Sequence, residues 1–324
     1  MKLDLKDRKL LYWLDQNSRA TNKELSKKIG LSQRGTAYKI EQLEKKGIIK
    51  KYVTFINTLS LGYGHYKVLL KLHNLSIEKE ELLIKKLVVN PNIRWVGKCE
   101  GIWDINFSIL AKSPEEFMEI YQKIEEYTKG LISEKMIHLV IKAPGFTKGY
   151  LIEENSKTVL NYNKSENSKD LNYLDLKILK SISQNARKSL VDLSKELKIN
   201  LDTVRYHIKK LEKEGIISGY TLTLDYDKIN IKRFSIYFNM IGMTKELENK
   251  IYEFAKFNNK FTFIVTMVGN YDLSLELEVL KENGVEEILK KFRKEFGEYI
   301  KKYEIIPITR EYKYDFYPLN ISKN

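Results

Sequence analysis

The chain has 324 residues, of which 43% are hydrophobic and 31% are charged, and this length allows at least two domains that each bury a core. No apolar stretch approaches the roughly 18 uninterrupted residues of a membrane span, and residues 1–8 are too charged for a secretion signal. With Cys99 as its one cysteine, the chain can form no internal disulfide and no cysteine-rich zinc site. We therefore expect a soluble, cytoplasmic protein.

The positive charge of the chain, formally +14, is concentrated in two segments. Residues 1–52 carry 14 Lys and Arg against 6 Asp and Glu, and residues 171–220 carry 10 against 6. These segments hold 12 of the 14 excess charges, whereas a generally lysine-rich composition would spread them evenly. The distribution indicates two surfaces that bind a polyanion.

The two basic segments are copies of each other. With a shift of 168 residues and no gap, the segment Leu3–Tyr52 aligns with Leu171–Tyr220, and 19 of the 50 aligned positions are identical. The same shift brings Gly101–Asp104 onto Gly269–Asp272, so the repeat covers most of the chain. The protein is a tandem duplication, and the polar segment Glu153–Asp170 between the copies is typical of a linker.

Each copy begins with a pattern that predicts three helices. The expected N-terminal caps of these helices are Asp4, Thr21, Ser32, Asn172, Ser189 and Asn200. In the third helix of each copy, apolar residues recur at helical spacing and predict a buried face. Gly47 and Gly215 then end that helix, and we expect the β-rich runs Ile48–Phe55 and Ile216–Leu224 to form a hairpin or wing.

A short helix, a tight turn and a longer basic helix form a helix-turn-helix, whose second helix enters the major groove of DNA. The predicted base-reading face of this helix consists of Gln33, Arg34, Ala37, Tyr38, Lys39, Thr203, Arg205, Tyr206 and Lys209. The residues expected to hold phosphates are Arg19, Arg187, Lys50 and Lys51. Asp202 would repel phosphate, so we expect the second copy to bind double-stranded DNA less well.

The segment from Leu31 to Tyr52 resembles the DNA-binding signature of the Lrp/AsnC family of transcription regulators, and the second copy repeats it from Ile199 to Tyr220. In that family a winged helix-turn-helix precedes a βαββαβ ferredoxin-like domain that dimerises and often senses amino acids. The resemblance implies an α+β fold in which both units occur twice. It implies DNA-binding domains at 1–60 and 171–230, ferredoxin-like domains at 61–150 and 231–318, and a linker at 151–170.

The sequence after each helix-turn-helix fits this order of elements. In the first copy we expect Tyr66–Leu72, Ile77–Leu87, Ile93–Cys99, Trp103–Leu110, Pro114–Tyr127 and Ile132–Ile141. In the second copy we expect Phe234–Met240, Lys245–Phe257, Phe261–Val268, Tyr271–Val279, Val285–Phe296 and Tyr299–Pro307. Members of the family usually carry one copy per chain, so the fusion predicts an intramolecular pseudo-dimer.

The repeated turn between the second and third expected strands has two interpretations. In the structural interpretation, Gly101 and Gly269 supply the positive φ of the turn, and Asp104 and Asp272 cap it. The family resemblance implies instead that this turn borders an amino-acid pocket, where backbone N–H groups hold the carboxylate of an effector and an aspartate pairs with its ammonium.

The alternative to a regulator is an enzyme, because siroheme decarboxylases of tetrapyrrole biosynthesis resemble this two-domain fold and sometimes occur as fused pairs. That resemblance implies a His-Arg pair followed by Gly-Phe and Asn-Ala-Met runs, and neither run is present. The histidines His65, His73, His138 and His207 show no metal-ligand spacing. We therefore predict a regulator that catalyses no reaction and needs no cofactor.

Overall fold

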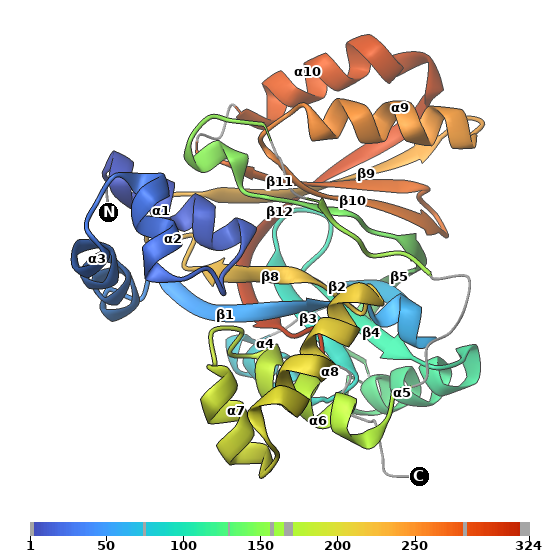
Figure 1. The fold of residues 1–324 in the computed structure, drawn as a ribbon. Coiled ribbons are helices and arrows are strands. Elements are labelled where there is room, and N and C mark those ends of the chain that lie inside the picture. Colours follow the sequence, from blue (N-terminus) through green and yellow to red (C-terminus); the bar gives the residue numbers. More distant parts are fainter. Residues whose placement is uncertain are drawn as a thin grey trace.

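The computed structural model describes residues 3–73, 76–128, 130–155, 159–164, 171–280 and 284–317. Each copy of the repeat supplies a three-helix unit and a four-stranded sheet with two helices, as Figure 1 shows. The expected α+β fold class is confirmed. Across the described ranges, no helix is both long and apolar enough to cross a bilayer.

The six expected helices of the two helix-turn-helix units are present. They are α1 (Leu5–Gln16), α2 (Asn22–Ile29), α3 (Gln33–Lys45), α6 (Tyr173–Ser183), α7 (Leu190–Leu197) and α8 (Leu201–Lys213). Each predicted cap accepts a hydrogen bond from the backbone N–H three residues further along the chain. These side chains satisfy donors that a helix leaves unpaired at its N-terminus, which is why the helix starts were predictable.

The strands that follow the two units, β1 (Ile49–Ile56) and β8 (Ile217–Leu224), pair with each other in antiparallel orientation. The predicted hairpin does not form within either copy, because each run supplies one strand of a ladder between the two copies. After β1 the chain enters a short 3₁₀ helix (Thr58–Leu61) instead of a tight turn, so no second strand of the same copy lies beside it. The strand of the other copy satisfies its backbone groups instead.

Each ferredoxin-like unit has two helices that cover a sheet. The first contains β2 (Gly64–Leu72), α4 (Ile77–Val89), β3 (Ile93–Cys99), β4 (Ile105–Ala111), α5 (Pro114–Tyr127) and β5 (Ile132–Lys142). The second contains β9 (Lys232–Met240), α9 (Lys245–Lys256), β10 (Phe261–Val268), β11 (Leu273–Val279), α10 (Gly284–Phe296) and β12 (Ile300–Tyr314). The strand orders, β3-β4-β2-β5 and β10-β11-β9-β12, are equivalent in the two copies.

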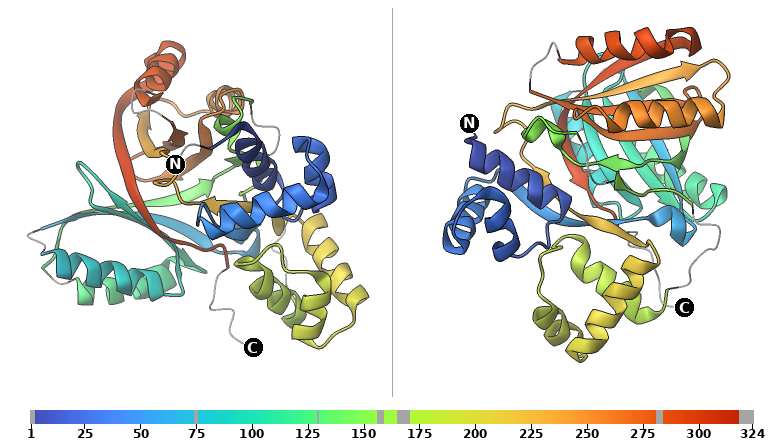
Figure 2. Two further views of the ribbon diagram at one scale, coloured as in Figure 1. Left: turned by 90° about the vertical axis from the view of Figure 1, so that its left-hand side faces the viewer. Right: turned by 45° about the horizontal axis from the view of Figure 1, so that its top comes forward.

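The two sheets join into one closed barrel. Strand β12 pairs with β3, and β10 pairs with β5, so the last strand of each unit lies beside the second strand of the other. The helices lie outside the barrel, with α9 and α10 above it in Figure 1 and α4 and α5 below it. Figure 2 shows the same arrangement from two further sides. The two copies of one chain thus supply both halves of the barrel.

Part of the expected linker belongs to the folded core. Gly145–Phe146 (β6) pairs with Val159–Leu160 (β7), and this pairing extends the sheet beyond β10. Tyr162 is buried, and its hydroxyl lies 2.6 Å from that of Thr58. Residues 156–158 and 165–170 of the expected linker lie outside the described residues.

Candidate nucleic-acid interface

The outer faces of α3 and α8 are open to solvent. Tyr38 on α3 is 61% exposed, and Tyr206, 168 positions later on α8, is 65% exposed. The opposite face of α3 is buried in the core of its unit through Thr36, Ile40 and Leu43. An aromatic side chain exposed at the same place on both helices is available to contact a partner.

The charged residues nearest the start of α3 include one arginine without a partner. Arg34 and Gln33 are exposed, and among the described residues Arg34 makes no hydrogen bond, ion pair or ring contact. The positive end of a helix dipole lies at this terminus and favours a phosphate there. Ala37 is half-buried on the same helix.

On α8 the corresponding side chains differ. Lys209 is exposed, and Thr203 is half-buried next to the helix cap. Arg205 pairs with Asp202 one turn earlier, which offsets the repulsion predicted from that carboxylate and occupies the guanidinium. The two helices therefore present different chemistry to a partner.

Lys39 holds two helices of its own unit together. Its Nζ lies 2.8 Å from Asp4 and 2.7 Å from Asp7, both at the start of α1, and the hydrogen bond from Lys39 is the main reason why the pKa of Asp4 falls below its usual value. In the second copy the equivalent pair is His207 and Asp175, with Nδ1 2.7 Å from the carboxylate. These ion pairs count against the predicted base-reading role of Lys39.

Arg19 and Arg187 join the two helix-turn-helix units. Arg19 Nη1 donates to the carbonyls of Ala186 and Lys188, at 2.5 and 3.2 Å. Reciprocally, Arg187 Nη1 donates to Ser18 O at 2.7 Å and to Ala20 O at 3.2 Å. These bonds count against their predicted role as phosphate contacts, because each guanidinium already satisfies carbonyl groups in the turn of the other copy.

The two lysines at the start of β1 remain at the surface. Lys50 lies 3.8 Å from Asp225, and Lys51 Nζ donates to Gln184 at 2.9 Å. Both lysines are exposed, and such contacts contribute little in water. The lysines can therefore exchange these partners for a phosphate.

The repeated turns have the same hydrogen bond in both copies. Asp104 Oδ2 accepts from the backbone N–H of Leu72, and Asp272 Oδ2 accepts from that of Met240, both at 2.7 Å. Gly101 has φ +97°, and a side chain at Gly269 would collide with His138. These contacts support the structural interpretation, since an amino-acid ammonium would have to compete for carboxylates already in use.

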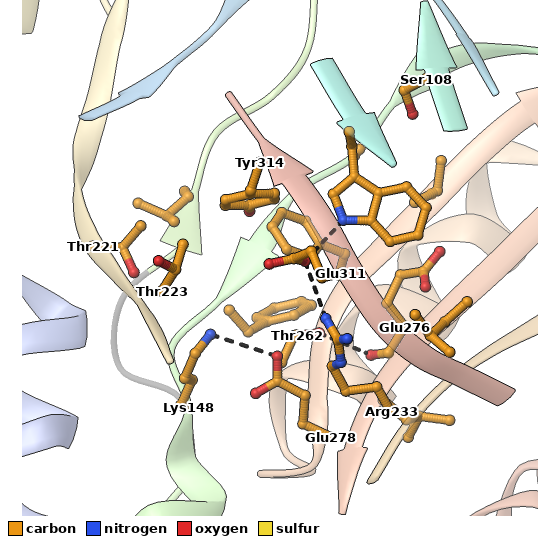
Figure 3. A pocket seen from close by; sticks show the side chains of 18 of the residues that line it. Ser108, Lys148, Thr221, Thr223, Arg233, Thr262, Glu276, Glu278, Glu311 and Tyr314 are labelled. Carbon is orange, nitrogen blue, oxygen red and sulfur yellow. Dashed lines mark hydrogen bonds and ion pairs between the residues drawn. The ribbon is translucent and has the colours of Figure 1, made fainter. Parts of the chain in front are cut away.

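No sequence motif predicted the cavity of about 150 Å³ that lies inside the barrel, next to β8 (Figure 3). Its charged lining includes Lys67, Arg94, Lys148, Arg233, Asp15, Glu276, Glu278 and Glu311. Burial raises the pKa of Asp15 although Lys148 lies beside it. These residues come from several strands, from α1 and from the segment after β6, and they share no motif. None of Gly101, Asp104, Gly269 and Asp272 in the repeated turns lines the cavity.

Comparison with known proteins matches both helix-turn-helix units to a winged helix-turn-helix DNA-binding family, over residues 3–50 and 171–218. An uncharacterised HTH-type transcriptional regulator of Pyrococcus furiosus is 31% identical over 107 residues, which are 32% of this chain and 69% of that protein. A second such regulator of Pyrococcus furiosus is 29% identical over 143 residues, which are 43% of this chain and 92% of that protein.

The chain belongs to the Lrp/AsnC family of helix-turn-helix transcription regulators. It is a tandem member of that family, because less than half of it corresponds to nearly the full length of a relative. The crystal structure of the siroheme decarboxylase NirDL has a TM-score of 0.61 and 12% identity, and the match covers 95% of this chain and 92% of that one. At that identity the similarity shows a shared fold across both copies.

Proposed function

We propose that this protein is a sequence-specific DNA-binding transcription regulator whose two helix-turn-helix units act from a single chain. The observation that carries this proposal is the pair of equivalent, solvent-exposed faces on α3 and α8, in the two segments that hold most of the net positive charge. Arg34, Gln33 and Tyr38 are the base-reading candidates on α3, and Thr203, Arg205, Tyr206 and Lys209 are those on α8. Lys50 and Lys51 are candidates for phosphate contacts.

The two half-sites of the operator should be related and not identical. Gln33-Arg34 at the start of α3 corresponds to Leu201-Asp202 at the start of α8, so the first helix can donate hydrogen bonds where the second cannot. In paired helix-turn-helix proteins the half-sites lie about one turn of DNA apart, roughly 34 to 36 Å. We expect the α3 half-site to dominate the affinity.

In vitro selection of bound duplexes from a random pool tests this function. We expect enrichment of two unequal half-sites about 10 base pairs apart. The logarithm of the affinity should fall linearly with the logarithm of the salt concentration, with a slope of about −0.9 per neutralised phosphate. Equal affinity for enriched and random duplexes would contradict sequence-specific binding.

A siroheme decarboxylase-like enzyme is the second candidate, and the fold shared with NirDL over both copies supports it. The absence of the Gly-Phe and Asn-Ala-Met runs counts against it, and the cavity inside the barrel, at about 150 Å³, is far smaller than a tetrapyrrole. Adding siroheme and following its main absorption band would separate the candidates. We expect no saturable change, whereas saturable binding with loss of carbon dioxide would favour the enzyme.

An amino-acid effector at Gly101, Asp104, Gly269 and Asp272 is a separate part of the proposal. The family resemblance supports it, and the hydrogen bonds of both aspartates to the backbone count against it. Calorimetry with the twenty amino acids, with and without DNA, tests it. Binding heat from one amino acid that disappears in Asp104→Ala or Asp272→Ala would support an effector site at these turns.

A further inference from the structure

The cavity inside the barrel lies where the barrel meets the helix-turn-helix units. Thr221 and Thr223 of β8 line one side of it in Figure 3, and Arg233 and Glu276 line another. Asp15, near the end of α1, also lines the cavity and accepts a hydrogen bond from Thr221 Oγ1 at 2.6 Å. The cavity therefore contacts the barrel, the helix α1 of the first helix-turn-helix unit and the strand β8 that follows the second.

Most of the charged groups around the cavity are paired within the protein. Lys67 lies 2.6 Å from Glu276, and Arg233 lies 3.0 Å from Glu311. Lys148 is 3.6 Å from both Asp15 and Glu278. Two tyrosine hydroxyls and the Trp95 indole also donate to these acids.

Arg94 is the exception. It is only 7% exposed, its Nη1 has no hydrogen-bond partner, and no described carboxylate lies within ion-pair distance of it. Its guanidinium lies 4.0 Å from the ring centre of Phe316 and 4.4 Å from that of Tyr162. A guanidinium stays charged when buried, so this lining includes a desolvated cation that an external anion can pair with.

His65 lies in the same lining and is also unsatisfied. Neither of its ring nitrogens has a hydrogen-bond partner, and its ring centre lies 5.7 Å from that of Tyr162, which also contacts Arg94. Burial, assisted by Arg94 and Lys67, lowers the pKa of His65 well below its usual value, so the ring is neutral. A neutral imidazole offers one N–H donor and one acceptor.

The size and the remaining lining of the cavity define the rest of a ligand. Leu160, Phe263 and Val265 contribute apolar surface. A volume of about 150 Å³ accommodates roughly one six-membered ring, as an engineered cavity of that size binds benzene. A small molecule with an apolar body and one carboxylate matches this combination of surface, volume and unpaired cation.

Both halves of the barrel line the cavity, as the equivalent positions Arg94 and Thr262 show, but the two copies differ where the cavity meets β8. The positions 168 residues before Thr221 and Thr223 hold Val53 and Phe55, and the position 168 residues after Lys148 holds Phe316. These three apolar side chains are fully buried. Aromatic rings thus fill the equivalent region on the β1 side, and a ligand would bind once per chain.

We propose that this cavity binds a small apolar monocarboxylate, with Arg94 as its anion anchor and His65 as a hydrogen-bond partner. The regulatory consequence rests on the proposed function. A ligand that contacts β8 and Asp15 changes DNA affinity to the extent that it binds the DNA-bound and free arrangements differently.

Calorimetry of the full chain with benzoate tests the site without DNA. We expect one benzoate per chain, and benzamide, a neutral molecule of the same shape, should bind at least about tenfold more weakly because it lacks the charge. Arg94→Gln should weaken benzoate binding by a similar factor. Arg310→Gln removes an exposed arginine of β12 and should leave it unchanged.

A second variant guards against a folding defect. Thr223→Phe places on β8 the aromatic ring that Phe55 supplies at the equivalent position of β1, and it should abolish benzoate binding by filling the cavity. The thermal unfolding temperature should stay within a few degrees of that of the wild type. The proposal is overturned if folded wild-type protein binds neither benzoate nor hexanoate at millimolar concentration, or if Arg94→Gln and Thr223→Phe leave binding intact. Anisotropy with an operator duplex then tests regulation separately: benzoate should change DNA affinity in the wild type and not in Arg94→Gln.

Discussion

We expect specific DNA binding by the first unit to depend most on Arg34. It is exposed at the start of α3 and has no partner in the described chain, so two of its N–H donors can bind guanine O6 and N7. Arg34→Ala should cost about 1–3 kcal/mol of binding free energy and relax the preference at one base pair. Anisotropy titrations against a set of single-base operator variants measure both effects. Arg310→Ala is the matched control, and unchanged specificity in Arg34→Ala would remove Arg34 from the base-reading set.

Asp175 links pH to the stability of the second helix-turn-helix unit. Burial opposes its ionisation, but hydrogen bonds from Lys210 and His207 hold the pKa of Asp175 below its usual value. A depressed carboxyl pKa contributes stability above the unfolded value of about 3.9, and that contribution is lost as the pH falls through the folded value. Asp175→Asn should therefore cost about 1–3 kcal/mol at pH 7 and progressively less below about pH 4.

Urea unfolding at a series of pH values measures this difference. Asp202→Asn is the control, because the Asp202 side chain is 88% exposed and its removal should leave the pH dependence nearly unchanged. An Asp175→Asn deficit that is equally large at pH 2.5 and pH 7 would show that packing, and not ionisation, is responsible.

At this scale, local chemistry was predictable and long-range partners were not. Caps such as Ser32 and Asn200 act on backbone groups three residues away, so the sequence window that contains them is sufficient. The partners of Lys39 lie 32 and 35 residues away, and Arg19 bonds to the other copy. The cavity was missed for the same reason, because Arg94 and His65 have no neighbours in sequence that mark a site.

Among the elements, the contact between the two helix-turn-helix units sets their relative placement. Arg187 donates to carbonyls in the turn after α1, and Arg19 does the same in the turn after α6. Arg187→Ala should destabilise the protein by about 1.5–3 kcal/mol, the range for hydrogen bonds to charged groups. It should weaken DNA binding without changing the dependence of affinity on salt, because no phosphate contact is lost.

Operator titrations from about 50 to 200 mM salt test this prediction against the phosphate-contact role. Lys50→Ala is the comparison, and the removal of a true phosphate contact should reduce the salt slope by about one. A reduced slope in Arg187→Ala would restore that arginine to the DNA interface.

Several strand boundaries depend on tertiary pairing. The prediction ended the last strand at Pro307, whereas β12 continues to Tyr314, because its first part pairs with β9 and its second part with β3. The expected strand at Trp103 begins instead at Ile105, after the turn that Asp104 caps. Periodicity identified the strands, but only the partner sheet fixes where they end.

For the whole molecule, duplication within one chain removes the need for two identical halves. A homodimer built from one such unit must place the same side chains on both sides of its axis. Here Thr223 lines a cavity on one side while Phe55 fills the equivalent place on the other. The fused chain can therefore combine one open cavity with one closed core, and two different recognition helices with one operator.

The pairing of β1 with β8 within one chain is directly testable by a disulfide. Lys51 and Thr223 are facing partners in this ladder, and facing residues have Cα atoms about 4.5–5.5 Å apart, within the range that a disulfide spans. On oxidation, Lys51→Cys/Thr223→Cys should cross-link within one chain, run as a monomer on a non-reducing gel and scatter light as one chain. Tyr52→Cys/Thr223→Cys is the control, because Tyr52 faces Leu222 in the regular part of the ladder and therefore points to the opposite face. Cys99 is buried and should not interfere. Covalent dimers from the first variant would show instead that halves exchange between chains, and that the pairing unit in solution is two molecules.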